Sequence, residues 1–220
     1  MTIKIKPNYD DNRNNLADVV PLSSPYTVII EITRLCNFKC YYCMHSTRDD
    51  AEGSYNRIKL EKNNIDMALF NRISREIAEM KPQPKRVLIQ GLGEPLINQE
   101  LSKMIRQLRE DKFEGRIDIV TNGSLFSKDN VREIIDSGVS KIIISLQGMT
   151  EEAYKENCQY PINFEELVSN LTYLYENRKN VHVYIKIIDI MLKNDEERQR
   201  FYDIFGNISD TCNIEHLIVN

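Results

Sequence analysis

Three of the five cysteines in this 220-residue chain lie within eight residues, at Cys36, Cys40 and Cys43. They follow a β-branched run, 27–33, which predicts a strand that ends just before the first cysteine. Three thiolates on one tight loop can bind three irons of an iron–sulfur cube, which ordinarily has four cysteine ligands. An iron without a protein ligand is open to another molecule, as the open position of a catalytic zinc is. The spacing therefore indicates a cluster that leaves one iron for a different ligand.

A zinc site is the alternative use of this loop. Zinc can take the same three thiolates together with His45, because structural zinc sites close with four ligands. Zinc modules usually bring paired ligands from two separate segments, and here all four lie in one. This alternative would make the chain a non-enzymatic binding module. Cys158 and Cys212 have no neighbour at metal-ligand spacing and are interpreted as buried structural residues.

The composition is that of an ordinary globular domain, with 41% apolar residues, 28% charged residues and a net charge of −4. The acidic balance and the scattered Lys and Arg residues disfavour a nucleic-acid surface. The chain has no apolar run near the roughly 20 residues that span a bilayer, so no membrane partner is expected. The N-terminus has no signal-peptide core. Because a labile cluster needs a reducing compartment, we expect a cytoplasmic protein.

Strand-like runs alternate with amphipathic helical segments along most of the chain, which is typical of βαβ units and a parallel sheet. Six strand–helix units, the last without its helix, are too few for a closed eight-fold barrel. They predict an α/β fold, an open, partial (β/α)6 TIM-like barrel, with a flavodoxin-like sheet as the alternative. Residues 1–25 are expected to form a polar N-terminal extension, and 26–220 the core. The expected strands are 27–33, 86–90, 116–120, 141–144, 181–188 and 214–219, and the expected helices are 64–81, 98–111, 127–137, 150–157, 163–178 and 195–205.

Unusual polar or glycine-containing segments occur wherever an expected strand ends. The second strand runs into 91–95 (Gly-Leu-Gly-Glu-Pro), the third into 121–123 (Thr-Asn-Gly) and the fourth into 145–148 (Ser-Leu-Gln-Gly). In both candidate folds the ligand site forms at the carboxyl ends of the strands. Glycines allow a ligand close to the backbone, and the carboxylate of Glu94 can accept hydrogen bonds from an ammonium group.

The CxxxCxxC spacing, with Tyr42 just before the third cysteine, resembles the radical S-adenosylmethionine (SAM) superfamily. The resemblance implies that the three cysteines hold a [4Fe–4S] cluster and that SAM chelates the fourth iron. It also implies an electron donor such as flavodoxin or ferredoxin. An electron from the cluster would cleave SAM to methionine and a 5′-deoxyadenosyl radical, which abstracts hydrogen from a substrate.

The strand-end segments strengthen this resemblance. Residues 92–95 are similar to the family's GGEP motif, with Leu92 in place of the first glycine. The segment 145–148 is similar to a Ser-Leu-Asp-Gly strand end, but Gln147 replaces the acid and is not a general base. Lys155 and Lys186 can pair with the SAM carboxylate. The resemblance implies a SAM site lined by Tyr42, Gly91, Gly93, Glu94, Pro95, Thr121, Asn122, Ser145 and Gln147.

The substrate is expected by analogy rather than from the residues. Relatives with a similar fourth strand end often carry a Cys-rich C-terminal domain of the SPASM or twitch type. A peptide or protein substrate is therefore the first expectation, and a sugar or other small molecule the second. The chain stops on an apolar run, 217–219, so we expect a core domain cut from a longer protein.

Overall fold

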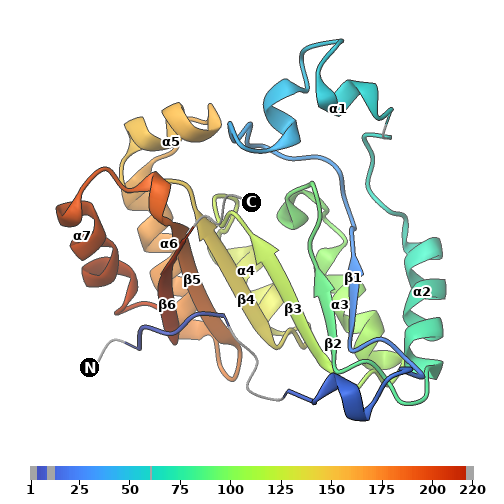
Figure 1. The fold of residues 1–220 in the computed structure, drawn as a ribbon. Helices are drawn as coiled ribbons and strands as arrows, with labels where there is room; N and C mark the ends of the chain where they lie inside the picture. The colour runs from blue at the N-terminus through green and yellow to red at the C-terminus, as the bar shows by residue number, and fades with distance from the viewer. Residues whose placement is uncertain (1–3, 9–12, 60, 217–220) are drawn as a thin grey trace.

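The computed structural model describes residues 4–8, 13–59 and 61–216, and its centre is one six-stranded sheet (Figure 1). All the strands are parallel, and each pairs with the next strand in the sequence. Parallel neighbours need a crossover connection, which explains the helix between each pair. The strands are β1 (Thr27–Ile30), β2 (Arg86–Ile89), β3 (Arg116–Thr121), β4 (Lys141–Leu146), β5 (His182–Ile188) and β6 (Thr211–Glu215).

The helices cover one face of the sheet and part of its carboxyl end. Figure 1 shows α1 and α5 above the carboxyl ends of the strands, whereas α2 and α7 flank the sheet. Short 3₁₀ helices occur in the connections, including η1 (Leu16–Asp18), η2 (Met44–Thr47), η3 (Pro95–Ile97) and η4 (Asp189–Met191). The helices are α1 (Ser54–Arg57), α2 (Met67–Glu79), α3 (Leu101–Glu110), α4 (Lys128–Ile135), α5 (Glu151–Cys158), α6 (Phe164–Asn177) and α7 (Asp195–Phe205).

Alternation along each strand divides the sheet into two faces. In β4, Ile142 and Ile144 belong to the apolar core between the sheet and the helices. Lys141, Ile143 and Ser145 point to the opposite face, which we call the inner face. It carries polar side chains on several strands, so its properties differ from those of the packed core.

The predicted fold class is confirmed. The sheet has β1 and β6 at its two edges in the described residues, so the barrel is open. Helix α2 is shorter than the predicted 64–81, and β1 ends at Ile30 although the apolar run continues. Helix α1 and η2 lie in 46–63, where no apolar periodicity predicted an element.

The last strand was predicted three residues too late. Strand β6 covers Thr211–Glu215 and not 214–219, and residues 217–219 of that prediction lie outside the described residues. The segment 211–213 (Thr-Cys-Asn) has low apolar content, so the sequence pattern did not mark it. Its position comes from pairing with β5, in which Tyr184 lies opposite Thr211.

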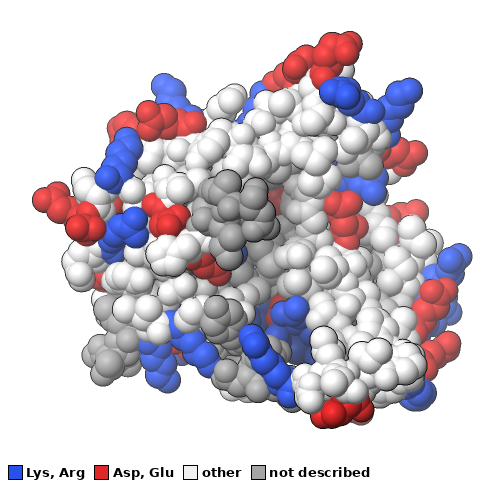
Figure 2. Space-filling view, viewed as in Figure 1, with Lys and Arg blue, Asp and Glu red and all other residues white. Residues whose placement is uncertain are grey.

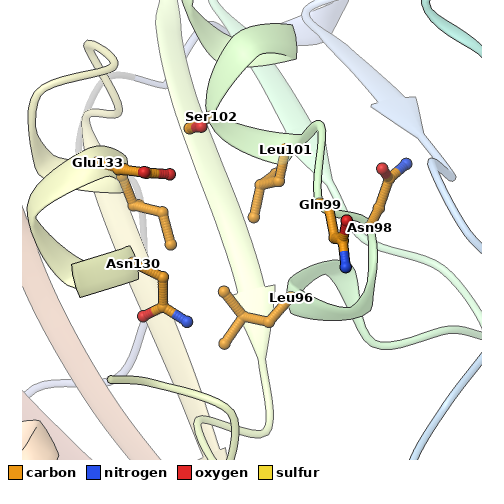
Figure 3. Close-up of a pocket in the computed structure, with 8 residues that line it drawn as sticks. Leu96, Asn98, Gln99, Leu101, Ser102, Asn130 and Glu133 are labelled. Carbon is orange, nitrogen blue, oxygen red and sulfur yellow. The ribbon is translucent and has the colours of Figure 1, made fainter. Parts of the chain in front are cut away.

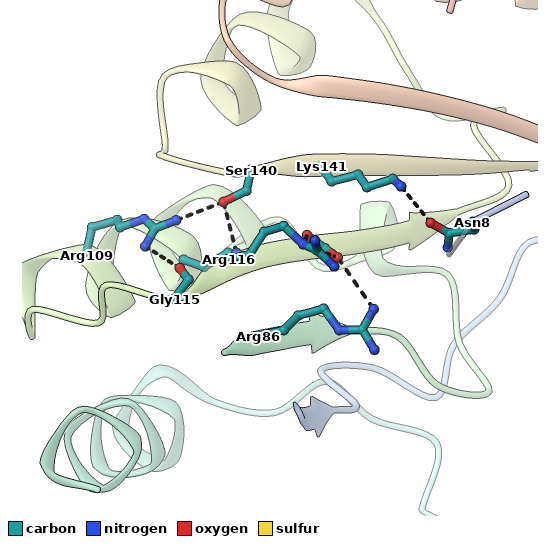
Figure 4. A network of polar contacts seen from close by, with 9 residues as sticks. Asn8, Arg86, Arg109, Gly115, Arg116, Ser140 and Lys141 are labelled. Atoms are coloured by element: carbon teal, nitrogen blue, oxygen red, sulfur yellow. Dashed lines mark hydrogen bonds and ion pairs between the residues drawn. The ribbon is translucent and has the colours of Figure 1, made fainter. Parts of the chain in front are cut away.

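The described part of the predicted extension, 1–25, crosses the amino end of the sheet. Ile5 forms a parallel bridge with Cys212 of β6, and the Lys141 Nζ donates to Asn8 Oδ1 at 2.6 Å. Beneath it, Figure 4 shows an ionic network on the inner face, in which Arg116 Nε lies 2.9 Å from Asp118 Oδ1. Arg86 contributes a second cation, 3.8 Å from the same carboxylate. These ion pairs connect β2 and β3 at the amino end of the sheet.

Candidate functional site

The cysteine loop lies at the carboxyl end of β1. Cys40 is buried, Cys36 and Cys43 are partly exposed, and all three thiols are free of disulfides. The loop turns tightly, because the N–H of Cys43 donates to Cys40 O at 2.9 Å. The N–H of Lys39 also donates to Cys158 O at 2.9 Å, which fixes the loop to the end of α5. The structure therefore presents three thiols beside the strand ends.

Side chains join this loop to the ends of β3 and β4. The Nδ2 of Asn122 donates to Asn37 Oδ1 at 2.9 Å, and the Nδ2 of Asn37 donates to Ser124 Oγ at 2.8 Å. On the other side, the Tyr42 hydroxyl donates to Gln147 Oε1 at 2.6 Å. Three regions that are distant in the sequence thus form one continuous layer.

The glycines after β2 pack against the chain that leads to the cysteines. A Cβ atom on Gly93 would lie 2.3 Å from Thr33 O, closer than atoms can approach. A Cβ atom on Gly91 would lie 2.5 Å from Glu31 Oε1. The backbone N–H of Glu94 donates to Leu35 O at 2.8 Å, which completes the contact. Only glycine allows this approach, and it places the Gly-Leu-Gly-Glu-Pro segment next to the loop.

Glu94 connects the ends of β2 and β3. Its Oε1 accepts from the Thr121 hydroxyl at 2.6 Å, and its Oε2 accepts from the Asn122 N–H at 2.7 Å. The N–H of Leu96 makes a third bond to Oε1 at 3.0 Å. Burial raises the pKa of the Glu94 carboxyl, while these donors act in the opposite direction. The carboxylate therefore holds the ends of β2 and β3 together.

The fourth and fifth strands place further polar groups at the carboxyl end of the inner face. Ser145, Lys186 and Asn213 lie in register across β4, β5 and β6. The Nζ of Lys186 pairs with Glu215 Oε2 at 2.7 Å, and the Tyr184 hydroxyl donates to Glu215 Oε1 at 3.0 Å. Within the described residues the Ser145 hydroxyl and the Asn213 amide make no hydrogen bond. These two groups remain available to a ligand on this face.

The donor set fits an iron–sulfur cube better than a single zinc ion. In the described part of the chain, no three His, Cys, Asp or Glu side chains converge closely enough to hold one metal ion. A cube does not require such convergence, because each thiolate binds a different iron. His45 is 2% exposed, and its ring lies 4.7 Å from the Tyr55 ring. Its environment is that of a packed aromatic side chain.

A pocket elsewhere does not involve these residues. A cavity of about 200 Å³ lies between η3, the start of α3 and α4, in the helical layer (Figure 3). Leu96, Asn98, Ser102 and Glu133 are among its lining residues. The carboxyl end of the inner face carries the thiols and the strand-end motifs, so it is the better candidate site.

The comparisons with known proteins identify the family. The model of the "Radical SAM superfamily" matches residues 30–205. The chain belongs to the radical SAM superfamily. Residues of this radical SAM chain are 27% identical, over 165 residues, to GTP 3′,8-cyclase of Campylobacter jejuni, a match covering 75% of this chain and 47% of the cyclase. A protein of Pyrococcus furiosus, the tungsten-containing aldehyde ferredoxin oxidoreductase cofactor-modifying protein, is 29% identical over 117 residues, which are 53% of this chain and 29% of that protein.

Solved structures show the same fold. Streptococcus suis SuiB bound to S-adenosylmethionine superposes with a TM-score of 0.68 at 20% identity, over 93% of this chain and 44% of SuiB. The family implies an enzyme with a [4Fe–4S] cluster and SAM. The chain spans about half the length of the first curated relatives it matches, 56% and 47%. None of the helices in residues 4–8, 13–59 and 61–216 has the length and apolarity of a bilayer-crossing segment.

Several contacts of the site were not predicted from the sequence. Asn37 was treated as a polar spacer between thiols, although its amide binds Asn122 and Ser124. Cys158, expected as an isolated structural residue, is fully buried, and its carbonyl binds the cysteine loop. Arg48, whose guanidinium donates to Cys36 O and Phe38 O in the cysteine loop, was not singled out at all. The Asn-Gly pair after β3 was the available signal for the first contact, but the other two depend on tertiary proximity.

Proposed function

We propose that this protein is a radical SAM enzyme whose [4Fe–4S] cluster is held by Cys36, Cys40 and Cys43. When bound, the cluster supplies the electron that cleaves SAM, and the resulting 5′-deoxyadenosyl radical abstracts hydrogen from the substrate. The protein's own contribution is to bind, orient and shield these groups. The proposed SAM site is lined by Tyr42, Gly91, Gly93, Glu94, Pro95, Thr121, Asn122, Ser145 and Gln147.

The observation that carries this proposal is the joining of the cysteine loop to three strand ends. Asn122 and Gln147 each hydrogen-bond a side chain of the loop, and Gly93 packs against the chain that leads into it. A cofactor bound at the open iron would therefore meet the ends of β2, β3 and β4. A structural zinc site closes with four protein ligands and does not require contacts with these strand ends.

The proposed substrate is a peptide or protein. Support comes from SuiB, whose structure bound to the precursor peptide SuiA covers 98% of this chain with a TM-score of 0.67 at 21% identity. That likeness shows the fold alone, so the substrate is carried over as a proposal. A small molecule is the alternative, favoured by relatives named as GTP 3′,8-cyclases. The inner-face pair of Lys186 and Glu215 lies on the strands farthest from the cysteine loop, where a substrate would lie beyond SAM.

The cellular setting follows from the same chemistry. We propose a cytoplasmic enzyme that takes electrons from a flavodoxin or ferredoxin, because the cluster needs a reducing compartment. We further propose that 1–25 is an extension, that 26–220 is the catalytic core, and that a SPASM or twitch-type domain belongs to the whole enzyme. The match covers only 56% and 47% of the first curated relatives, which supports a further domain in the whole enzyme.

An anaerobic reconstitution tests the proposal. The chain is loaded with iron and sulfide, SAM and dithionite are added, and 5′-deoxyadenosine is quantified. Wild type and Cys212→Ala should both be brown and form the product, because Cys212 is buried in β6 away from the loop. Cys40→Ala should form none. A colourless protein that retains zinc, or SAM cleavage by Cys40→Ala, would overturn the assignment.

A further inference from the structure

Arg48 contacts the backbone of the cysteine loop directly. It follows η2, and its Nη1 donates to Cys36 O at 2.6 Å and to Phe38 O at 3.3 Å. Both carbonyls lie between the first two proposed cluster ligands. One guanidinium nitrogen therefore joins two peptide groups of the segment that must hold its shape around a cluster.

This contact fixes which way the peptide groups face. In a trans peptide group the C=O and the N–H point in opposite directions. The unit of Phe38 and Lys39 is bound at both ends, because its C=O accepts from Arg48 and its N–H donates to Cys158 O at 2.9 Å. The backbone N–H of Phe38 belongs to the peptide unit between the two that Arg48 contacts, and it faces the Cys36 sulfur. In this conformation an N–H and not a carbonyl faces the sulfur, which favours a negatively charged ligand set.

Arg48 is itself held in place. Its carbonyl accepts from Asn56 Nδ2 at 2.9 Å, and the same amide donates to Asp50 O at 2.6 Å. The segment that follows the cysteine loop thus folds back, and Asn56 holds the backbone of Arg48 in place. Asn56 belongs to α1, so that short helix is connected to the site through one amide.

In the part of the chain that the structure describes, no carboxylate lies within ion-pair distance of Arg48. The neighbouring carboxylate, Asp49, is in contact with Lys39 and attracts Arg48 only at longer range. A cube with three thiolate ligands carries a net negative charge, so a guanidinium in the adjoining segment favours it electrostatically. The two observations, carbonyl contact and positive charge, point in the same direction.

We propose that Arg48 is a positioning residue that holds the loop from Cys36 to Cys40 in its cluster-binding conformation and so controls cluster retention and reduction potential. This inference rests on the proposed cluster ligands. A hydrogen bond from a charged donor contributes roughly enough free energy to change an equilibrium or rate about tenfold. Potentials of iron–sulfur clusters also respond to charge and to hydrogen bonds at the sulfurs.

The test compares Arg48→Gln and Arg48→Lys with Arg57→Gln, a matched control that removes an exposed arginine of α1, outside the cysteine loop. Each reconstituted chain is mixed with a ferrous chelator, and iron release is followed by absorbance. Arg48→Gln should lose iron about tenfold faster than wild type, because a single charged hydrogen bond is lost. The rate for Arg48→Lys should fall between those of Arg48→Gln and wild type, and Arg57→Gln should match wild type.

A redox titration followed by electron paramagnetic resonance gives a second readout that a general loss of folding would not move. The midpoint potential should be lower in Arg48→Gln and near the wild-type value in Arg57→Gln. Thermal unfolding of the cluster-free chains checks that all variants fold. Equal iron release and equal potentials in Arg48→Gln and wild type would overturn the inference, as would identical shifts in Arg57→Gln. A wild-type chain that binds no iron would instead overturn the cluster assignment, and this inference with it.

Discussion

The two ends of the inner face are both polar, but they use their polar groups differently. At the amino end, Asp118 is fully buried and lies between Arg116 and Arg86. At the carboxyl end, the Ser145 hydroxyl makes no hydrogen bond within the described residues, and the thiols of the cysteine loop are free. At the amino end the charges are paired within the protein, although the buried Arg86 Nε has no hydrogen bond, whereas the carboxyl end retains groups that are available to a ligand.

This difference separates stability from function on one surface. Buried charges are tolerated when they are paired, so the ionic network at the amino end holds the strands together. The carboxyl end instead presents partly exposed polar groups and thiols that a ligand can bind. The space-filling view shows acidic and basic side chains around the rim of the molecule (Figure 2), so total charge would not have located the site. Variants at each end can test whether stability and function depend on different ends of the inner face.

The largest effect is expected at the carboxyl end. Cys43→Ala should abolish iron binding, because two thiolates cannot hold a three-ligand cluster. The free energy of unfolding of the cluster-free chain should change by less than about 1 kcal/mol, since Cys43 is only partly buried. Iron analysis and urea unfolding measure the two quantities. Strong destabilisation of the cluster-free chain would show that the carboxyl end also holds the fold.

The amino end should give the reverse result. Asp118→Ala leaves two arginines without their shared carboxylate and should lower the free energy of unfolding by about 2–3 kcal/mol, toward the low side for a buried pair because both arginines are partly exposed. Urea unfolding measures the loss. Iron bound per folded chain should stay at the wild-type level. A variant that folds but fails to bind iron would show that the amino end also contributes to the function of the site.

Glu94 tests the boundary between the two roles. In Glu94→Gln one carboxylate oxygen becomes an amide that cannot accept from the Asn122 N–H, and this should cost about 1–2 kcal/mol. Because Glu94 holds the ends of β2 and β3 together, SAM affinity should also fall. Calorimetric titration of SAM into the reconstituted variant and urea unfolding separate these effects. Unchanged SAM affinity would assign Glu94 to stability alone.

The smallest effect is expected for Tyr42→Phe. It removes the hydrogen bond to Gln147, which contributes about 1 kcal/mol, together with the contact of the same hydroxyl with the Cys40 thiol. Tyr41→Phe is the matched control, because Tyr41 is similarly exposed at 52% and its hydroxyl makes no hydrogen bond to Gln147. SAM should bind several-fold more weakly to Tyr42→Phe only. Equal affinities in both variants would remove Tyr42 from the proposed site.

The repeated strand–helix pattern predicted the architecture because local apolar runs decide it. Strands β2 to β5 were found within a few residues of their predicted positions, since Val and Ile runs mark buried parallel strands. Strand β6 was misplaced because 211–213 is defined by its neighbour and not by its own composition. The pattern of apolar residues alone therefore locates the central strands of such a sheet better than its edge strand.

The part of the candidate site that short sequence motifs form could be predicted from the sequence. The cysteine spacing and the strand-end glycines were visible in the sequence, and the family match confirms the cofactor chemistry they implied. The role of Arg48 was not visible, because its partners are backbone carbonyls that no side-chain pattern records. The same holds for Cys158, whose carbonyl accepts from the Lys39 N–H and whose thiol lies against the thiol of Cys40.

The bridge between Ile5 and Cys212 has a consequence for the order of folding. Residues near the two ends of the sequence pair there, with Lys6 N donating to Cys212 O and Cys212 N donating to Lys4 O, each at 3.2 Å. All other strand pairings join neighbours in the sequence, so the sheet can grow one strand at a time during synthesis. The N-terminal segment must wait until β6 exists. It then covers part of an edge whose free N–H and C=O groups would otherwise be open to pairing with another chain, so a segment that is made before β1 becomes ordered only after β6.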